Sequence, residues 1–192
     1  MKIMDLKKIR KEMEKELTSK RYEHTLAVAY TAASLAMIHD EDTEKALIAG
    51  MLHDCAKCME GKKLVSICKK NNLEMSEIEM KNTSALLHAK VGSFYAEEKY
   101  GVADEDILNA IQFHTTGRPQ MSRLEKIIYI ADYIEPGRKH AANLAQIRKM
   151  AYQDLDKTLL KILEDTLAYL QTTDGQIDDM TMQTYDYYKN KK

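Results

Sequence analysis

Apolar residues recur at steps of three and four along most of this chain, which is the spacing of one face of an α-helix. The first such segment covers residues 5–18 and carries its apolar side chains at Leu6, Ile9, Met13 and Leu17. The same spacing predicts further helices over 21–39, 43–57, 62–71, 83–100, 104–117, 124–136, 143–170 with a break near 153–156, and 181–188. The pattern therefore predicts an all-α bundle of about eight helices.

Length and composition agree with one helical domain. The 192 residues include only 2 Pro and 7 Gly, so the turn chemistry of an all-β protein is missing. A chain of this length is expected to form one domain with a substantial core, and no repeat or linker divides it. We expect a single domain over 1–192, with the helices of 143–190 packed on the part that precedes them.

The charge distribution limits the partners. Charged residues make up 31% of the chain but cancel to a net charge of -1, so no global basic field attracts nucleic acid or an anionic membrane. The opening residues, MKIMDLKKIRKEMEKEL, contain no uninterrupted apolar stretch of the kind found in signal peptides and membrane anchors. We expect a cytoplasmic protein with no nucleic-acid and no membrane partner.

Three cysteines, Cys55, Cys58 and Cys68, should be reduced in that compartment. Cys55 and Cys58 form a C-x-x-C, a spacing found in redox and zinc sites. Because no second pair accompanies it, we interpret these cysteines as small filler residues beside a helix end.

Four histidines and two aspartates stand out because each lies on a predicted apolar helix or at its end. They are His24, His53, Asp54, His88, His114 and Asp132. One histidine alone is more often a surface or satisfied core residue than a ligand. Their joint occurrence favours a metal site, since Asp132 would be costly to bury in its apolar helix unless a cation lay beside it. A mixed set of nitrogen and oxygen ligands suits divalent ions.

The order and spacing of these residues resemble the HD superfamily, an all-α group of metal-dependent phosphohydrolases. The resemblance extends to the bacterial YqeK family of symmetrical bis(5'-nucleosyl)-tetraphosphatases, through LHDCAK, ALLHAKVG, AIQFHTTGRPQMSRLEKIIYIADYIEPGR and DLDKTLL. It implies an HD-domain helical bundle with a catalytic core at about 20–140. It also implies hydrolysis of diadenosine tetraphosphate to two ADP by metal-activated water.

The resemblance assigns roles to individual residues. The metal ligands it implies are His24, His53, Asp54 and Asp132. The metal it implies is iron, as one or two ions, although manganese, cobalt or zinc would suit the same ligands. His88 and His114 would face the nucleotide phosphates or complete a second metal site that Asp54 bridges.

The implied catalytic residues are His53, Asp54, Lys57, His88 and His114. The implied substrate-binding residues are His24, Asp54, Lys57, His88, His114, Thr115, Asp132, Arg138 and Lys139. Four of these have an ordinary alternative: Lys57 as a solvated lysine, Arg138 and Lys139 as an exposed basic pair, and Thr115 with Thr116 as a helix end.

Several features fit no assigned role. His39 and His140 fall outside the ligand order and are interpreted as surface residues. Residues 140–147 depart from the Pro-Gly-containing stretch of the family, which leaves the local contacts open. Tyr185, Tyr187 and Tyr188 could pack on the bundle or on a second subunit of a homodimer.

Two other functions use the same residues. One is an HD nucleotide or deoxynucleoside triphosphate phosphohydrolase, which would release different products. The other is a non-catalytic, metal-dependent nucleotide-binding sensor. In each case the partner is a dinucleoside polyphosphate or a nucleotide such as ADP or GDP, and the choice between adenine and guanine stays open.

Overall fold

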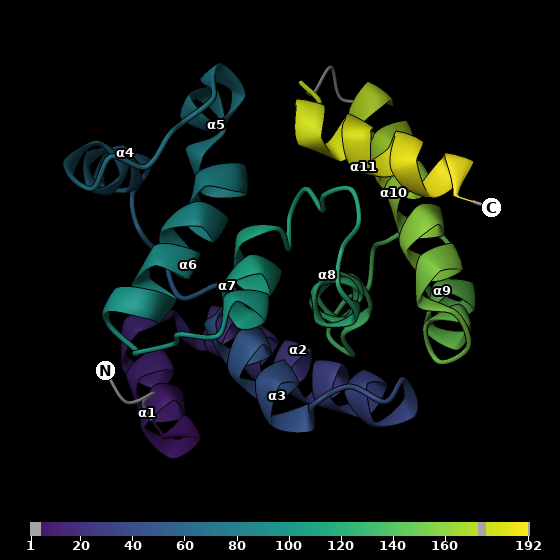
Figure 1. The fold of residues 1–192 in the computed structure, drawn as a ribbon, viewed down its shortest axis with the longest axis horizontal. Coiled ribbons are helices and arrows are strands. Elements are labelled where there is room, and N and C mark those ends of the chain that lie inside the picture. The colour runs from purple at the N-terminus through teal and green to yellow at the C-terminus, as the bar shows by residue number, and fades with distance from the viewer. Residues whose placement is uncertain (1–4, 173–175, 192) are drawn as a thin grey trace.

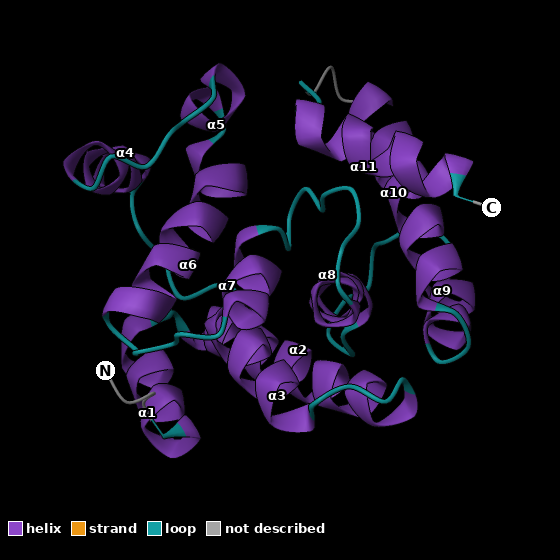
Figure 2. Cartoon of the chain, viewed as in Figure 1, coloured by secondary structure: helices purple, strands orange, loops and turns teal. Residues whose placement is uncertain are grey.

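The computed structural model describes residues 5–172 and 176–191, and these residues form helices joined by loops, with no strand (Figures 1 and 2). The all-α prediction is confirmed, with eleven α-helices in the described ranges rather than about eight. The helices are α1 (Leu6–Glu16), α2 (Ser19–Ile38), α3 (Thr43–Leu52), α4 (Gly61–Lys70), α5 (Glu77–Lys81), α6 (His88–Glu98), α7 (Glu105–Gln112), α8 (Arg123–Ile134), α9 (Leu144–Ala151), α10 (Leu155–Thr172) and α11 (Asp179–Asn190). Within the described ranges, no helix combines the length and the hydropathy that a membrane span requires.

One short helix, α5, had not been predicted. It begins at a capping box, in which the Ser76 side chain accepts from the Glu79 backbone and the Glu79 side chain accepts from the Ser76 backbone. The expected break between 143 and 170 is confirmed by the separation of α9 and α10.

The predicted helix over 43–57 ends earlier, at Leu52. Beyond it the backbone bonds change to steps of three residues, from Cys55 to Leu52, from Lys57 to Asp54 and from Met59 to Ala56. These tight turns leave the regular helix but keep Asp54 buried.

The predicted helix over 83–100 is also divided. Thr83–Leu87 form a π-helical turn, and α6 begins at His88. A π turn is a rare form of helix that occurs most often beside functional sites. Here it directly precedes His88, which is fully buried.

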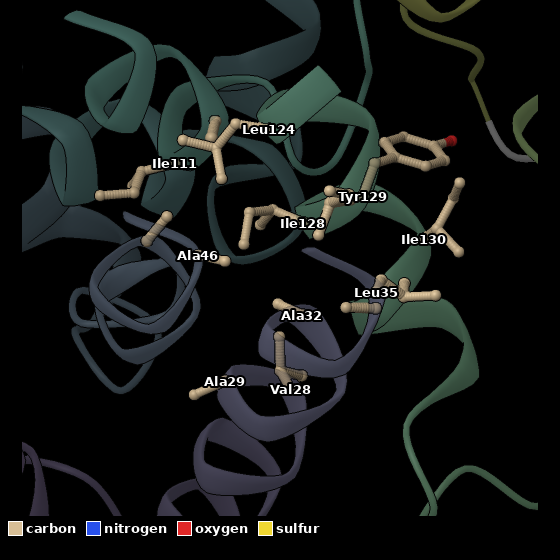
Figure 3. Packing of buried hydrophobic residues seen from close by; sticks show 14 of the residues in the cluster. Val28, Ala29, Ala32, Leu35, Ala46, Ile111, Leu124, Ile128, Tyr129 and Ile130 are labelled. Atoms are coloured by element: carbon tan, nitrogen blue, oxygen red, sulfur yellow. The ribbon is translucent and has the colours of Figure 1, made fainter. Parts of the chain in front are cut away.

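The main core lies between α2, α3, α7 and α8 (Figure 3). Figure 1 shows α8 end-on near the centre of the molecule, between α7 and the C-terminal helices. The buried side chains from α2 are mostly small, including Ala29, Ala32 and Ala36. Small residues allow helix axes to approach closely, so α2 and α3 lie in extended contact.

The two helices approach closely at Gly50 of α3. A Cβ at this position would lie 2.6 Å from the Cα of Ala29 in α2, so no larger side chain fits without movement. Because His24 lies on α2 and His53 directly follows α3, this contact also sets the distance between the two histidines.

The C-terminal helices complete the bundle. α10 packs on α8, and α11 packs on α10. Tyr188 is buried in the main core, and Tyr185 and Tyr187 are half-buried against it, so all three tyrosines pack on their own chain. A second, smaller cluster of buried residues lies around α4 and α6 and includes Leu64, Leu87 and Val91.

Candidate metal centre

The fold gathers all six candidate ligands, which are separated by up to about a hundred residues in sequence. His24 comes from α2, His53 and Asp54 from the turn after α3, and His88 from the start of α6. His114 follows α7 and Asp132 lies on α8. The six side chains form two adjoining groups that share Asp54.

The first group consists of His24, His53, Asp54 and Asp132. The Asp54 Oδ2 atom lies 3.2 Å from His53 Nε2 and 3.6 Å from His24 Nε2. The Asp132 Oδ1 atom lies 3.1 Å from His24 Nε2. Ligands that share one ion at about 2.1 Å lie about 3.0 to 3.4 Å from each other. The two shorter separations fall in this range and the third is slightly longer, so the group suits a common cation.

The second group uses the other oxygen of Asp54. Its Oδ1 lies 3.1 Å from His88 Nε2 and 3.8 Å from His114 Nε2, and the two Nε2 atoms are 3.2 Å apart. Asp54 therefore presents one carboxylate oxygen to each group. This is the arrangement of a carboxylate that bridges two ions.

Three of the four histidines are oriented by a hydrogen bond from Nδ1. His53 Nδ1 donates to the carbonyl of Gly50, and His114 Nδ1 donates to the carbonyl of Ile111, each at 2.7 Å. His24 Nδ1 donates to Glu135 Oε1 at 3.3 Å. A carbonyl or carboxylate oxygen can only accept, so these bonds place the lone pair of a neutral ring on Nε2, which faces the centre.

Glu135 was not identified from the sequence. Its carboxylate is buried and also accepts from the backbone of Gly137. Carboxylates that accept from the outer nitrogen of a ligating histidine are common around metal sites, where they orient the ring and raise its basicity. A Glu directly before a Pro-Gly turn gives no such signal in sequence.

Several buried atoms of the centre lack hydrogen-bond partners. They are His24 Nε2, His53 Nε2 and Asp54 Oδ1. Leaving buried polar atoms unpaired is costly in free energy, and a cation bonded to them would remove that cost. The residues present therefore fit a divalent ion.

The electrostatics favour neutral rings in the second group. Burial lowers the pKa of His114 to about 3, and the nearby His53 and His88 add to this effect. Burial also lowers the pKa of His88. Burial alone would lower the pKa of His53, but Asp54 beside it raises the pKa overall, so a proton on that ring has to leave when a cation binds.

The two carboxylates are ionised. Burial opposes their charge, but the adjacent His53 holds the pKa of Asp54 well below its usual range, and the neighbouring His24 and His53 rings do the same for Asp132. An ionised carboxylate is the form that binds a cation.

Lys57 lies against the second group. Its Nζ donates to the carbonyl of Ser84 at 2.9 Å and lies 3.4 Å from His88 Nε2. Burial lowers the pKa of this ammonium group. The position, partly enclosed and directed at His88, differs from that of a freely solvated lysine.

A cavity of about 1080 Å³ adjoins the first group on the side of His24. The predicted basic residues Arg138 and Lys139 line it, as does Arg21, which was not singled out from the sequence. Arg138 Nη2 lies 3.1 Å from Asp132 Oδ1 and also donates to the Asp132 carbonyl. Arg21 Nη1 lies 2.8 Å from Asp54 Oδ2.

The remaining predicted residues lie farther from the centre or in ordinary surroundings. Thr115 is half-buried directly after His114, and the Thr116 hydroxyl donates to the carbonyl of Gly117. His39 is half-buried and donates from Nε2 to the carbonyl of Ala151, so it is a satisfied residue at a helix end. His140 is exposed and lines the cavity.

The cysteines are free thiols. Cys55 is buried beside Gly92, while Cys58 is exposed, so only the first of the pair is a filler residue as predicted.

Residues 21–137 match the HD domain family. The chain is 40% identical to a symmetrical bis(5'-nucleosyl)-tetraphosphatase of Staphylococcus aureus over 187 residues, which cover 96% of this chain and 95% of the relative. It is 37% identical to a protein of the same description from Bacillus subtilis, over 91% of this chain and 92% of the relative.

The structure is also similar to a solved one. A crystal structure from Clostridium acetobutylicum, described as a predicted HD superfamily hydrolase involved in NAD metabolism, superposes with a TM-score of 0.95. The two chains are 44% identical, and the match covers 100% of each.

Proposed function

This chain belongs to the HD domain family, and on that premise we propose that it hydrolyses symmetrical dinucleoside tetraphosphates, such as diadenosine tetraphosphate, to two nucleoside diphosphates. The observation that carries the proposal is the agreement over nearly the whole chain with relatives that are symmetrical bis(5'-nucleosyl)-tetraphosphatases. The convergence of six ionisable candidate ligands beside a cavity supports it.

The residues that would hold the metal are His24, His53, Asp54 and Asp132 for a first ion, and Asp54, His88 and His114 for a second. Bound there, a divalent ion would polarise a phosphoryl oxygen and lower the pKa of the attacking water. Iron is the metal we propose, and manganese, cobalt and zinc suit the same mixture of imidazole and carboxylate ligands.

The orientation of His114 favours a metal ligand over a phosphate contact. Its Nδ1 already donates to Ile111, and its low pKa leaves Nε2 without a proton at neutral pH. A phosphate oxygen only accepts hydrogen bonds, so an unprotonated Nε2 has nothing to donate to it. A cation is the partner that such a nitrogen can bind.

The substrate is highly anionic, and this chain offers cations on two sides. Arg138 and Lys139 line the cavity next to the first group, and Lys57 lies beside His88 in the second. We assign these three residues to the phosphates, where an ammonium or guanidinium group offsets the charge that develops during attack. Symmetrical cleavage requires attack by water on one of the two central phosphorus atoms, with ADP as leaving group.

Product analysis tests the function. Purified, metal-reconstituted protein is incubated with diadenosine tetraphosphate, and the products are separated by chromatography beside a chelated sample. Metal-dependent formation of ADP alone is expected. AMP with ATP would place the attack at another bond, and intact dinucleotide would refute the proposal.

The same assay separates the alternatives that use this site. A nucleotide or deoxynucleoside triphosphate phosphohydrolase would leave the dinucleotide intact and act on mononucleotides instead. A sensor would bind the dinucleotide without turnover. The homodimer and the cytoplasmic location stay predictions.

A further inference from the structure

Two arginines form ion pairs with the two carboxylates of the first ligand group. Arg21 Nη1 is 2.8 Å from Asp54 Oδ2, and Arg138 Nη2 is 3.1 Å from Asp132 Oδ1. Both arginines line the same cavity, although they come from opposite ends of the core sequence. Arg138 was expected near the nucleotide, and Arg21 is its counterpart on the other carboxylate.

The oxygen that Arg21 contacts is also the one that faces the histidines. Asp54 Oδ2 lies 3.2 Å from His53 Nε2 and 3.6 Å from His24 Nε2. A cation shared by these atoms would lie beside the guanidinium group. Two positive charges on one oxygen repel each other, so the cation and Arg21 compete for Asp54.

The guanidinium group of Arg21 can move into the cavity when a cation displaces it from Asp54. The Arg21 side chain is 33% exposed and lies at the wall of the cavity, whereas Asp54 is 4% exposed behind it. Arg138 Nε is buried and has no hydrogen-bond partner, so the opposite wall already holds an N–H group without an acceptor. A guanidinium fork matches the oxygens of a phosphate group.

Three acidic residues line the cavity, and two of them are engaged elsewhere. Glu135 is engaged by His24 and by the Gly137 backbone, and Asp165 is engaged by Lys161 and Asn143. The third, Glu23, is exposed and is outnumbered by the basic residues of the lining, Lys20, Arg21, Arg138 and Lys139. The cavity therefore suits an anion near the two arginines.

We propose that Arg21 is a phosphate-binding residue of the substrate which, in the metal-free protein, occupies Asp54 Oδ2 and competes with the metal ion for it. The identity of the anion rests on the proposed function. Metal and substrate binding are then coupled, because the ion releases the guanidinium that the phosphate needs, and the phosphate in turn holds the guanidinium away from the ion.

The test compares Arg21→Ala with Arg10→Ala. Arg10 is an exposed arginine on α1 that contacts Tyr22 of α2 but does not line the cavity, so its replacement removes the same charge near the same helix. Mn²⁺ is titrated into each metal-free protein by calorimetry. Arg21→Ala should bind Mn²⁺ about tenfold more tightly than the parent, because a charged hydrogen bond no longer has to break. Arg10→Ala should match the parent.

Kinetics supply the second half of the test. With diadenosine tetraphosphate and saturating metal, Arg21→Ala should raise KM by about tenfold or more, and Arg21→Lys should recover part of the loss. Tighter metal binding together with weaker substrate binding is a combination that simple misfolding does not produce.

The outcomes separate this inference from the proposed function. Unchanged or weaker Mn²⁺ binding by Arg21→Ala would overturn the competition between Arg21 and the metal ion. An unchanged KM would overturn the contact between Arg21 and the phosphate. In both cases, turnover by the parent would leave the proposed function standing. If the parent fails to cleave the dinucleotide, the proposed function is refuted. The role of Arg21 is then tested by comparing the affinity of the Mn²⁺-loaded parent and Arg21→Ala proteins for inorganic pyrophosphate. Equal pyrophosphate affinity would overturn it.

Discussion

Replacing Gly50 by Ala should damage both stability and catalysis, because this glycine lies where the backbones of α2 and α3 are in close contact. The new Cβ would lie 2.6 Å from Ala29 Cα, whereas carbon atoms in contact prefer about 3.5 Å or more. The helices therefore have to separate by about 0.9 Å at this point. Overpacking of this kind costs about 1 to 3 kcal/mol, and the better helix propensity of Ala offsets about 1 kcal/mol of it.

The movement would also displace the ligands. His24 and His53 are carried by the two helices that separate, and a displacement near 1 Å in an active site reduces rates by about a hundredfold. Since both helices share the movement, we expect a loss of at least about tenfold in kcat and weaker metal binding. The net cost of up to about 2 kcal/mol lowers the melting temperature by up to about 8 °C.

The matched control is Gly92→Ala in α6. Its Cβ would lie 3.5 Å from the His53 carbonyl and from the Ile111 side chain, which is ordinary contact. Thermal melts and turnover of both variants are compared with the parent. Gly92→Ala should equal or exceed the parent in stability, and a Gly50→Ala protein as stable and active as the parent would refute the close-packing argument.

Three further perturbations test the centre itself. Glu135→Gln, which weakens the acceptor for His24 Nδ1, should lower metal affinity by about tenfold in a metal titration, and an unchanged affinity would remove Glu135 from the site. Lys57→Met should raise KM for the dinucleotide and leave metal affinity near that of the parent, and equal kinetics would make Lys57 an ordinary lysine. The metal-free protein should become less stable to urea as the pH falls below about 6.5. His114 alone should lower the free energy of unfolding by about 1.4 kcal/mol per pH unit. The reason is that the His114 ring takes up a proton in the unfolded chain, whereas burial in the folded protein lowers its pKa to about 3. His114→Gln should reduce that slope, and an unaltered slope would contradict the assigned protonation state.

The helical pattern predicted most of the fold because the apolar spacing is strong in the long helices. The additional helix α5 was missed although Ser76 and Glu79 form a capping box, since only five residues follow the cap and they carry no extended apolar face. The π turn before His88 was missed for a different reason. Its hydrogen bonds depend on tertiary packing, and its residues have the composition of an ordinary helix.

The six candidate ligands could be picked out because each is a polar group in an apolar context, and the structure brings all six together. Glu135 and Arg21 could not be found in this way. Their partners, His24 and Asp54, lie 111 and 33 residues away in sequence, so only the folded chain reveals the pairs. The S-x-x-E spacing of Ser122 and Glu125 is that of a capping box, but only half of the box forms. Ser122 caps α8, whereas the Glu125 side chain binds Arg118.

The most direct test of the central claim is the turnover of Asp54→Ala, since Asp54 presents one oxygen to each ligand group. Parent and variant are reconstituted with the same metal, their folding is compared by circular dichroism, and the release of ADP from diadenosine tetraphosphate is measured. The account predicts a folded variant with bound metal strongly reduced and no detectable ADP. Near-normal release of ADP by the variant would contradict it.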